Sequence, residues 1–82
     1  MNNLINEFEQ IIRWPKKRLE QGRVIEWLSK KFESEKKYSE KEINQIIRAH
    51  HEFEDTPLLR RELISKKYLA RQDDGSEYWK IN

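Results

Sequence analysis

Two short amphipathic helices with clearly marked starts constrain the fold of this chain most. Ser39-Glu40-Lys41-Glu42 has the pattern of a capping box, in which the serine hydroxyl and the glutamate carboxylate each accept from the other residue's backbone amide. Thr56-Pro57 marks the second start, with threonine as the predicted N-cap and proline at the first helical position. Isoleucines and leucines at helical spacing follow both starts, and the second helix should end near Lys66 or Lys67.

Further elements lie on either side of this helix pair. An apolar face predicts a helix over about residues 21–33, followed by a short extended stretch. Residues 68–71 and 77–81 flank Asp74-Gly75, a pair that favours a tight reversal and hence a β-hairpin. The order helix, extended stretch, helix, helix, hairpin is that of a winged helix-turn-helix, which we assign to residues 14–82.

An additional helix is expected at the N-terminus. Apolar residues at helical spacing predict an amphipathic helix over residues 1–13, which Trp14-Pro15 should end because proline disfavours a helical residue before it. The fold class is therefore mainly α with a small β-hairpin: a winged helix-turn-helix with an extra N-terminal helix. The apolar stripe either packs on its own domain, which we favour, or forms an interaction face toward a second copy or a regulator protein. It comprises Leu4, Ile5, Phe8, Ile11 and Ile12.

Composition narrows the class of protein. The 82 residues contain no cysteine, which excludes disulfides and thiolate metal sites and agrees with a reducing cytoplasm. The N-terminus lacks the pattern of a signal peptide, and no apolar run approaches the roughly 18–20 residues of a membrane span. We therefore expect a cytoplasmic protein that does not contact a membrane.

Charge is distributed unevenly along the chain. The net charge is only +2, yet residues 11–31 hold seven basic and two acidic residues, and residues 56–72 hold five basic and one acidic residue. Such a chain can present a basic face without being basic overall. Within the first of these segments, Lys16-Lys17-Arg18 is more simply a solvated turn than a phosphate contact or localisation string.

The second helix of the pair is the candidate recognition helix. On a helical wheel Arg61 points away from the apolar side centred near Leu59, so it is the residue expected to meet base edges in a DNA major groove. The alternative is that Arg60 and Arg61 pair with Glu40, Glu42 or Glu54. The acidic hairpin tip, Asp73 and Asp74, should stay away from phosphates. The candidate DNA-binding residues are Thr56, Arg60, Arg61, Ser65, Lys66, Lys67 and Arg71.

Several strings also resemble a bacterial family known as a conserved domain of unknown function, over about residues 14–82. They include Trp14-Pro15-Lys16-Lys17-Arg18, Tyr38-Ser39-Glu40-Lys41-Glu42-Ile43-Asn44, Leu58-Leu59-Arg60-Arg61-Glu62-Leu63, and Asp74-Gly75 with Tyr78-Trp79. Members occur alone or fused behind winged-helix repressors of the metal-sensor type. The resemblance implies a winged-helix-like fold and a place in transcriptional regulation. This sequence departs from the family pattern at Lys67, where the family commonly has a glycine that closes the helix. The resemblance does not extend to residues 1–13.

Metal binding and catalysis have little support in the sequence. Adjacent helical side chains point about 100° apart, so His50 and His51 cannot close on one ion, and no further histidine exists. We expect instead that Phe53 fills the core and one histidine caps its helix. We predict no catalytic residues, no metal and no cofactor. The chain is expected to be a non-enzymatic DNA-binding or transcription-associated module, or alternatively a protein-interaction domain that acts through the winged-helix surface or the N-terminal helix.

Overall fold

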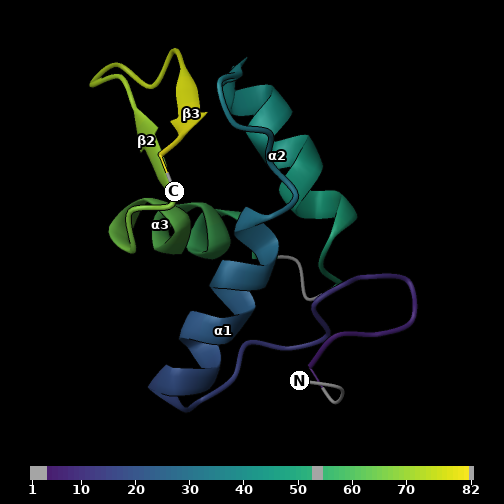
Figure 1. Ribbon diagram of the computed structural model, residues 1–82. Coiled ribbons are helices and arrows are strands. Elements are labelled where there is room, and N and C mark those ends of the chain that lie inside the picture. Colours follow the sequence, from purple (N-terminus) through teal and green to yellow (C-terminus); the bar gives the residue numbers. More distant parts are fainter. Residues whose placement is uncertain (1–3, 53–54, 82) are drawn as a thin grey trace.

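The computed structural model describes residues 4–52 and 55–81, and its element order is that of a winged helix-turn-helix (Figure 1). Three helices are followed by a three-stranded antiparallel sheet in the order β1-β3-β2. The elements are α1 (Arg18–Ser29), β1 (Lys37–Tyr38), α2 (Glu40–Ala49), α3 (Thr56–Ser65), β2 (Leu69–Arg71) and β3 (Tyr78–Lys80). The predicted winged helix-turn-helix, mainly α with a small β-hairpin, is confirmed.

The helix α1 begins earlier than expected. It starts at Arg18, ahead of the expected residue 21, and runs through Gly22. A Cβ at Gly22 would meet nothing within 4 Å, so this glycine is open to solvent and needs no special backbone conformation. Leu19 is 69% exposed because it lies opposite the buried face formed by Val24, Ile25 and Leu28.

The predicted starts of α2 and α3 differ in outcome. The capping box is present: the Ser39 hydroxyl accepts from the Glu42 amide, and the Glu42 carboxylate accepts from the Ser39 amide. For α3 the N-cap is Asp55, not Thr56, because the Asp55 carboxylate accepts from the Leu58 amide at 3.2 Å. Thr56 is then the first helical residue, and Pro57 follows it within the first turn.

The small sheet consists of the predicted hairpin and one further strand. We refer to the β2–β3 hairpin as the wing. Its reversal has Gly75 at a φ of 75°, as the Asp-Gly pair predicted. The extended stretch before α2 pairs with β3, with Lys37 opposite Trp79 and Tyr38 opposite Tyr78. This pairing ties the wing to the start of α2.

One hydrophobic core joins the helices, the sheet and the N-terminal segment. Phe32, Tyr38 and Tyr78 are buried, and Phe32 and Tyr38 meet edge to face with ring centroids 5.7 Å apart. In the view of Figure 1, α3 lies between α1 and the wing. The remaining buried hydrophobic residues are Leu4, Ile11, Val24, Ile25, Leu28, Ile43, Ile47, Leu59, Leu63 and Leu69.

The helix expected over residues 1–13 is wrong for residues 4–13, which form a loop. We call residues 4–12 the N-terminal loop. Asn6 closes this loop. Its side-chain oxygen accepts from the backbone amides of Phe8 and Gln10, and its backbone amide donates to the Gln10 carbonyl. Asparagine competes with helix formation in this way because its short side chain can bond nearby backbone groups. Glu9, at a φ of 58°, completes the turn.

Candidate nucleic-acid interface

The outward side of α3 is uncovered, as the helical wheel predicted. Leu59 and Leu63 are buried, whereas Arg61 and Ser65 are exposed on the other side of the helix. Within residues 4–52 and 55–81, no carboxylate lies within ion-pair distance of Arg61. A guanidinium in this position is free to form a bidentate contact with a base or phosphate.

Arg60 is placed differently from Arg61. It is half-buried, and its Nη1 donates to Oδ1 of Asn44 on α2 at 2.6 Å. The bond ties the two helices of the helix-turn-helix together. Its partner among the described residues is an amide on α2 and not Glu40 or Glu42, two of the three carboxylates of the alternative prediction. Of those carboxylates, Glu54 lies outside the described residues.

A groove runs between α3 and the wing. Three arginines from two elements border it, together with one carboxylate from the first turn of α2. The lining residues are Glu40, Pro57, Arg60, Arg61, Ile64, Ser65, Arg71 and Tyr78. Sequence reasoning placed the arginines on one face but missed the groove, because the position of Glu40 and Tyr78 depends on the β1–β3 pairing, which the sequence did not reveal.

Tyr78 and Glu40 are linked at the edge of this groove. The Tyr78 hydroxyl donates to Oε1 of Glu40 at 2.8 Å. Burial raises the pKa of Tyr78, and the bond to the Glu40 carboxylate raises it further. The phenol therefore remains protonated and keeps Glu40 oriented. Glu40 is the one carboxylate that lines the described groove, against three guanidinium groups.

The end of α3 carries three further predicted contact residues. Ser65, Lys66 and Lys67 are all exposed. The ammonium of Lys66 lies 3.4 Å from the carboxylate of Glu62, so a phosphate would compete with that carboxylate. Lys67 adopts a φ of 66°, the left-handed conformation that a helix-closing glycine would also adopt.

The structure bears on three further expectations about the contact surface, those for Thr56, Arg71 and the wing tip. Thr56 is only 6% exposed, and its hydroxyl oxygen lies 3.4 Å from Nε2 of His51, so its side chain offers little surface to a bound duplex. Arg71 is exposed on β2 and lines the groove from the wing side. The wing tip is acidic as expected: Asp73 and Asp74 are exposed, and the bond from Ser76 lowers the pKa of Asp74.

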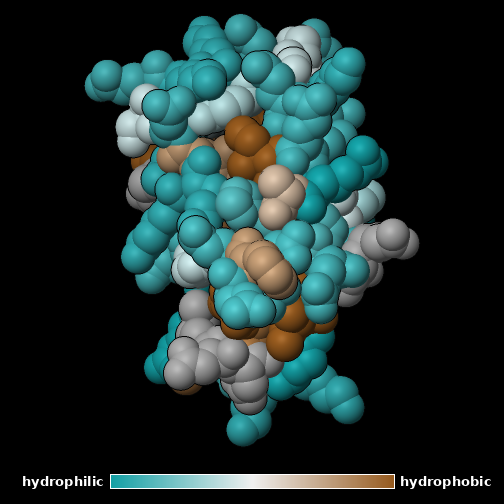
Figure 2. All heavy atoms as spheres, turned by 90° about the vertical axis from the view of Figure 1, so that its right-hand side faces the viewer, coloured by the Kyte–Doolittle hydropathy of each residue, from teal (hydrophilic) through white to brown (hydrophobic). Residues whose placement is uncertain are grey.

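The predicted interaction face at the N-terminus does not exist as a stripe. Leu4 and Ile11 are buried in the core, so the preferred expectation of intramolecular packing is confirmed for both. Ile5 and Ile12 are half-buried, and Phe8 alone of the five is strongly exposed, at 74%. Figure 2 shows a largely hydrophilic face on which the hydrophobic areas are small and separated.

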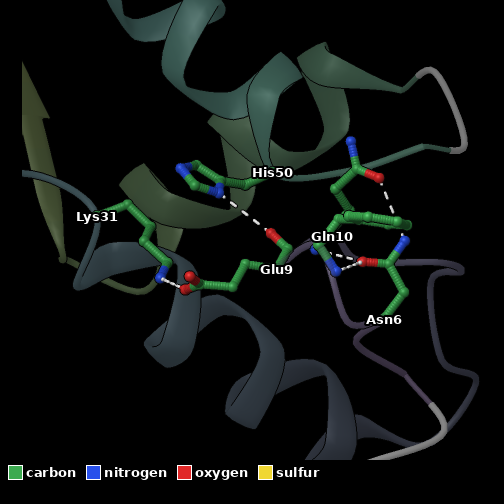
Figure 3. A network of polar contacts seen from close by, with 6 residues as sticks. Asn6, Glu9, Gln10, Lys31 and His50 are labelled. Atoms are coloured by element: carbon green, nitrogen blue, oxygen red, sulfur yellow. Dashed lines mark hydrogen bonds and ion pairs between the residues drawn. The ribbon is translucent and has the colours of Figure 1, made fainter.

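Polar contacts fix the N-terminal loop to residues that directly follow α1 and α2 (Figure 3). The Glu9 carboxylate pairs with Lys31, which lowers the pKa of Glu9, and the Glu9 carbonyl accepts from Nδ1 of His50 at 3.1 Å. The amide of Ile11 donates to the His50 carbonyl at 2.8 Å. The loop therefore braces the end of α2, just before the turn that leads to α3.

Both histidines are engaged by the backbone. Nδ1 of the buried His51 lies 2.6 Å from the Ile47 carbonyl, which can only accept, so the proton is on Nδ1. His51 thus caps α2, as expected of one histidine. Phe53, expected to fill the core, lies outside the described residues. In the part of the chain that the structure describes, no three His, Asp or Glu side chains are grouped closely enough to hold a metal ion.

Comparison with known proteins identifies the family of the chain. None of the helices in the described part of the chain is long and apolar enough to span a bilayer. No curated protein and no solved structure matches the chain. A family model, described as an uncharacterized protein conserved in bacteria (DUF2087), matches residues 10–80. Because this match spans most of the 82 residues, the chain belongs to that bacterial family.

Proposed function

We propose that this protein is a non-enzymatic DNA-binding or transcription-associated module that inserts the outward face of α3 into the major groove. The observation that carries the proposal is the exposed Arg61, which has no carboxylate partner within the described residues, on the second helix of a helix-turn-helix. In this fold class, base contacts come from that helix face. Arginine is suited to the contact because its fork matches guanine O6 and N7.

The charges around α3 support a contact with the DNA phosphate backbone on the same side of the domain as Arg61. Residues 56–72 carry a net charge of +4. Arg71 and Lys67 border the face from the wing and from the end of the helix, where phosphates of a bound duplex would lie. Arg60 acts as a positioning residue, because its bond to Asn44 fixes α3 against α2.

The wing sets the orientation of the proposed complex. The carboxylates of Asp73 and Asp74 at its tip would repel phosphates, so the duplex meets α3 and the base of the wing and leaves the tip in solvent. The alternative expectation is protein interaction through the winged-helix surface or the N-terminal helix. Its second route has lost support, since residues 4–13 form a loop with Leu4 and Ile11 buried.

Binding to a random-sequence duplex, measured by fluorescence anisotropy at several salt concentrations, tests the proposal. We expect log K to fall with log salt by about 0.9 per phosphate contact. On a duplex that the unmodified protein selects from a random pool, Arg61→Ala should weaken binding by about 1–3 kcal/mol. Arg23→Ala, which removes an exposed arginine from α1, is the matched control and should bind like the unmodified protein. Affinity weaker than millimolar at low salt, or equal binding by the two variants, contradicts the proposal.

A further inference from the structure

Glu40 is an acidic residue in a place where the proposed function calls for basic ones. It lines the groove between α3 and the wing together with Arg60, Arg61 and Arg71. Its carboxylate does not form an ion pair with any of these arginines in the described structure. It is instead held by the Tyr78 hydroxyl at 2.8 Å. The carboxylate is therefore fixed beside the cations without neutralising any one of them by direct contact.

Glu40 and Arg71 approach the same point of the wing. A Cβ placed on Gly75 would lie 3.8 Å from Nη1 of Arg71 and 3.9 Å from Oε1 of Glu40. A phosphate held by Arg71 would therefore also lie close to the Glu40 carboxylate. Like charges at such separations repel, and the repulsion is stronger beside a protein surface than in bulk water.

We propose that this groove binds one backbone phosphate of a bound nucleic acid through Arg71, and that Glu40 limits how tightly the phosphate is held. The inference rests on the proposed function and adds a specific role for Glu40. The groove is preorganised for it, since Arg60 is fixed by Asn44 and Glu40 by Tyr78. The Glu40 carboxylate lies beside this phosphate site in the free protein. A phosphate that binds to Arg71 must therefore overcome the repulsion from its negative charge.

The test compares two variants that change the net charge equally. Glu40→Gln removes the charge in the groove, and Glu26→Gln removes an exposed charge from α1. In about 0.1 M salt, Glu40→Gln should bind a random duplex about fivefold more tightly than the unmodified protein, and Glu26→Gln within about twofold of it. Thermal unfolding of both variants establishes that each is folded at the temperature of the binding measurement.

A third variant identifies the phosphate contact. Arg71→Ala should weaken binding and lower the slope of log K against log salt by about 0.9. Combining Arg71→Ala with Glu40→Gln should remove most of the gain from Glu40→Gln, because the phosphate would no longer be held beside residue 40. An undiminished gain in the double variant overturns the assignment of the contact to Arg71.

The outcomes separate this inference from the proposed function. If the protein binds duplex through Arg61 but Glu40→Gln behaves like Glu26→Gln, only the role of Glu40 is overturned. If neither the unmodified protein nor Glu40→Gln binds duplex at low salt, both proposals are overturned. Both proposals are supported if Glu40→Gln alone raises the affinity for duplex and Arg71→Ala lowers the slope of log K against log salt.

Discussion

Replacing Lys67 by glycine should make the protein more stable, although it removes a charged side chain from the end of α3. Lys67 has a φ of 66° and follows the C-cap residue Lys66. The amide of Tyr68 donates to the Leu63 carbonyl, and that of Lys67 donates to the Ile64 carbonyl, each at 3.0 Å. These two bonds define a Schellman motif, which requires a left-handed residue at this position. The helix end therefore has left-handed geometry with a lysine in place of a glycine.

The size of the effect follows from backbone sterics. A residue with a Cβ gives up roughly 1–2 kcal/mol in the left-handed conformation, whereas glycine adopts it freely. Glycine offsets roughly 0.5–1 kcal/mol of that gain through its larger conformational freedom in the unfolded chain. The net gain should be about 1 kcal/mol, which for a domain of this size raises the melting temperature by about 4–8 °C.

Thermal unfolding followed by circular dichroism measures this gain, with Lys67→Ala as the control. Alanine removes the same lysine contacts but keeps the Cβ, so Lys67→Ala should be no more stable than the unmodified protein. The difference between the two variants isolates the backbone effect. Equal melting temperatures for Lys67→Gly and Lys67→Ala would refute the argument.

Three further predictions concern other parts of the fold. Gly22→Ala should stabilise α1 by roughly 0.5–1 kcal/mol, because a Cβ there meets nothing; an unchanged or lower melting temperature contradicts this. Ile11→Ala should cost about 2–5 kcal/mol and Ile12→Ala clearly less, as measured by urea unfolding; similar losses would show that the N-terminal loop does not bury Ile11. The bond from the Ser39 amide lowers the pKa of Glu42 in the folded protein. The stability that ionised Glu42 contributes is therefore fully present above its pKa in the unfolded chain, and it is lost as the pH falls through the lower pKa of the folded protein. Glu42→Gln should therefore flatten the fall of stability below about pH 4.5, and an unchanged pH profile contradicts this.

The elements with strong local signals were predictable from the sequence. The capping box at Ser39 and the Asp-Gly reversal of the wing both formed as expected, because each is decided by a few neighbouring residues. The outward direction of Arg61 followed from helical geometry alone. The start of α3 was misplaced by one residue because Asp55 and Thr56 are both good N-caps, and the burial of Thr56 beside His51 left the role to Asp55.

The N-terminal loop shows where periodicity misleads. Leu4 and Ile11 are spaced as on one face of a helix, but a loop closed by Asn6 buries both equally well. The local signal that favours the loop is the asparagine side chain, which can bond the backbone of the next residues. The same limit applies to the groove, since no local pattern places Glu40 of α2 beside Tyr78 of β3.

The central claim, that the outward face of α3 binds duplex DNA, is tested most directly by mapping amide chemical-shift changes as duplex is added at low salt. The account predicts that the largest changes fall in the helix Thr56–Ser65 and at Arg71, with small changes at the wing tip. Largest changes in α1 or the N-terminal loop, or no changes at millimolar duplex, would contradict it.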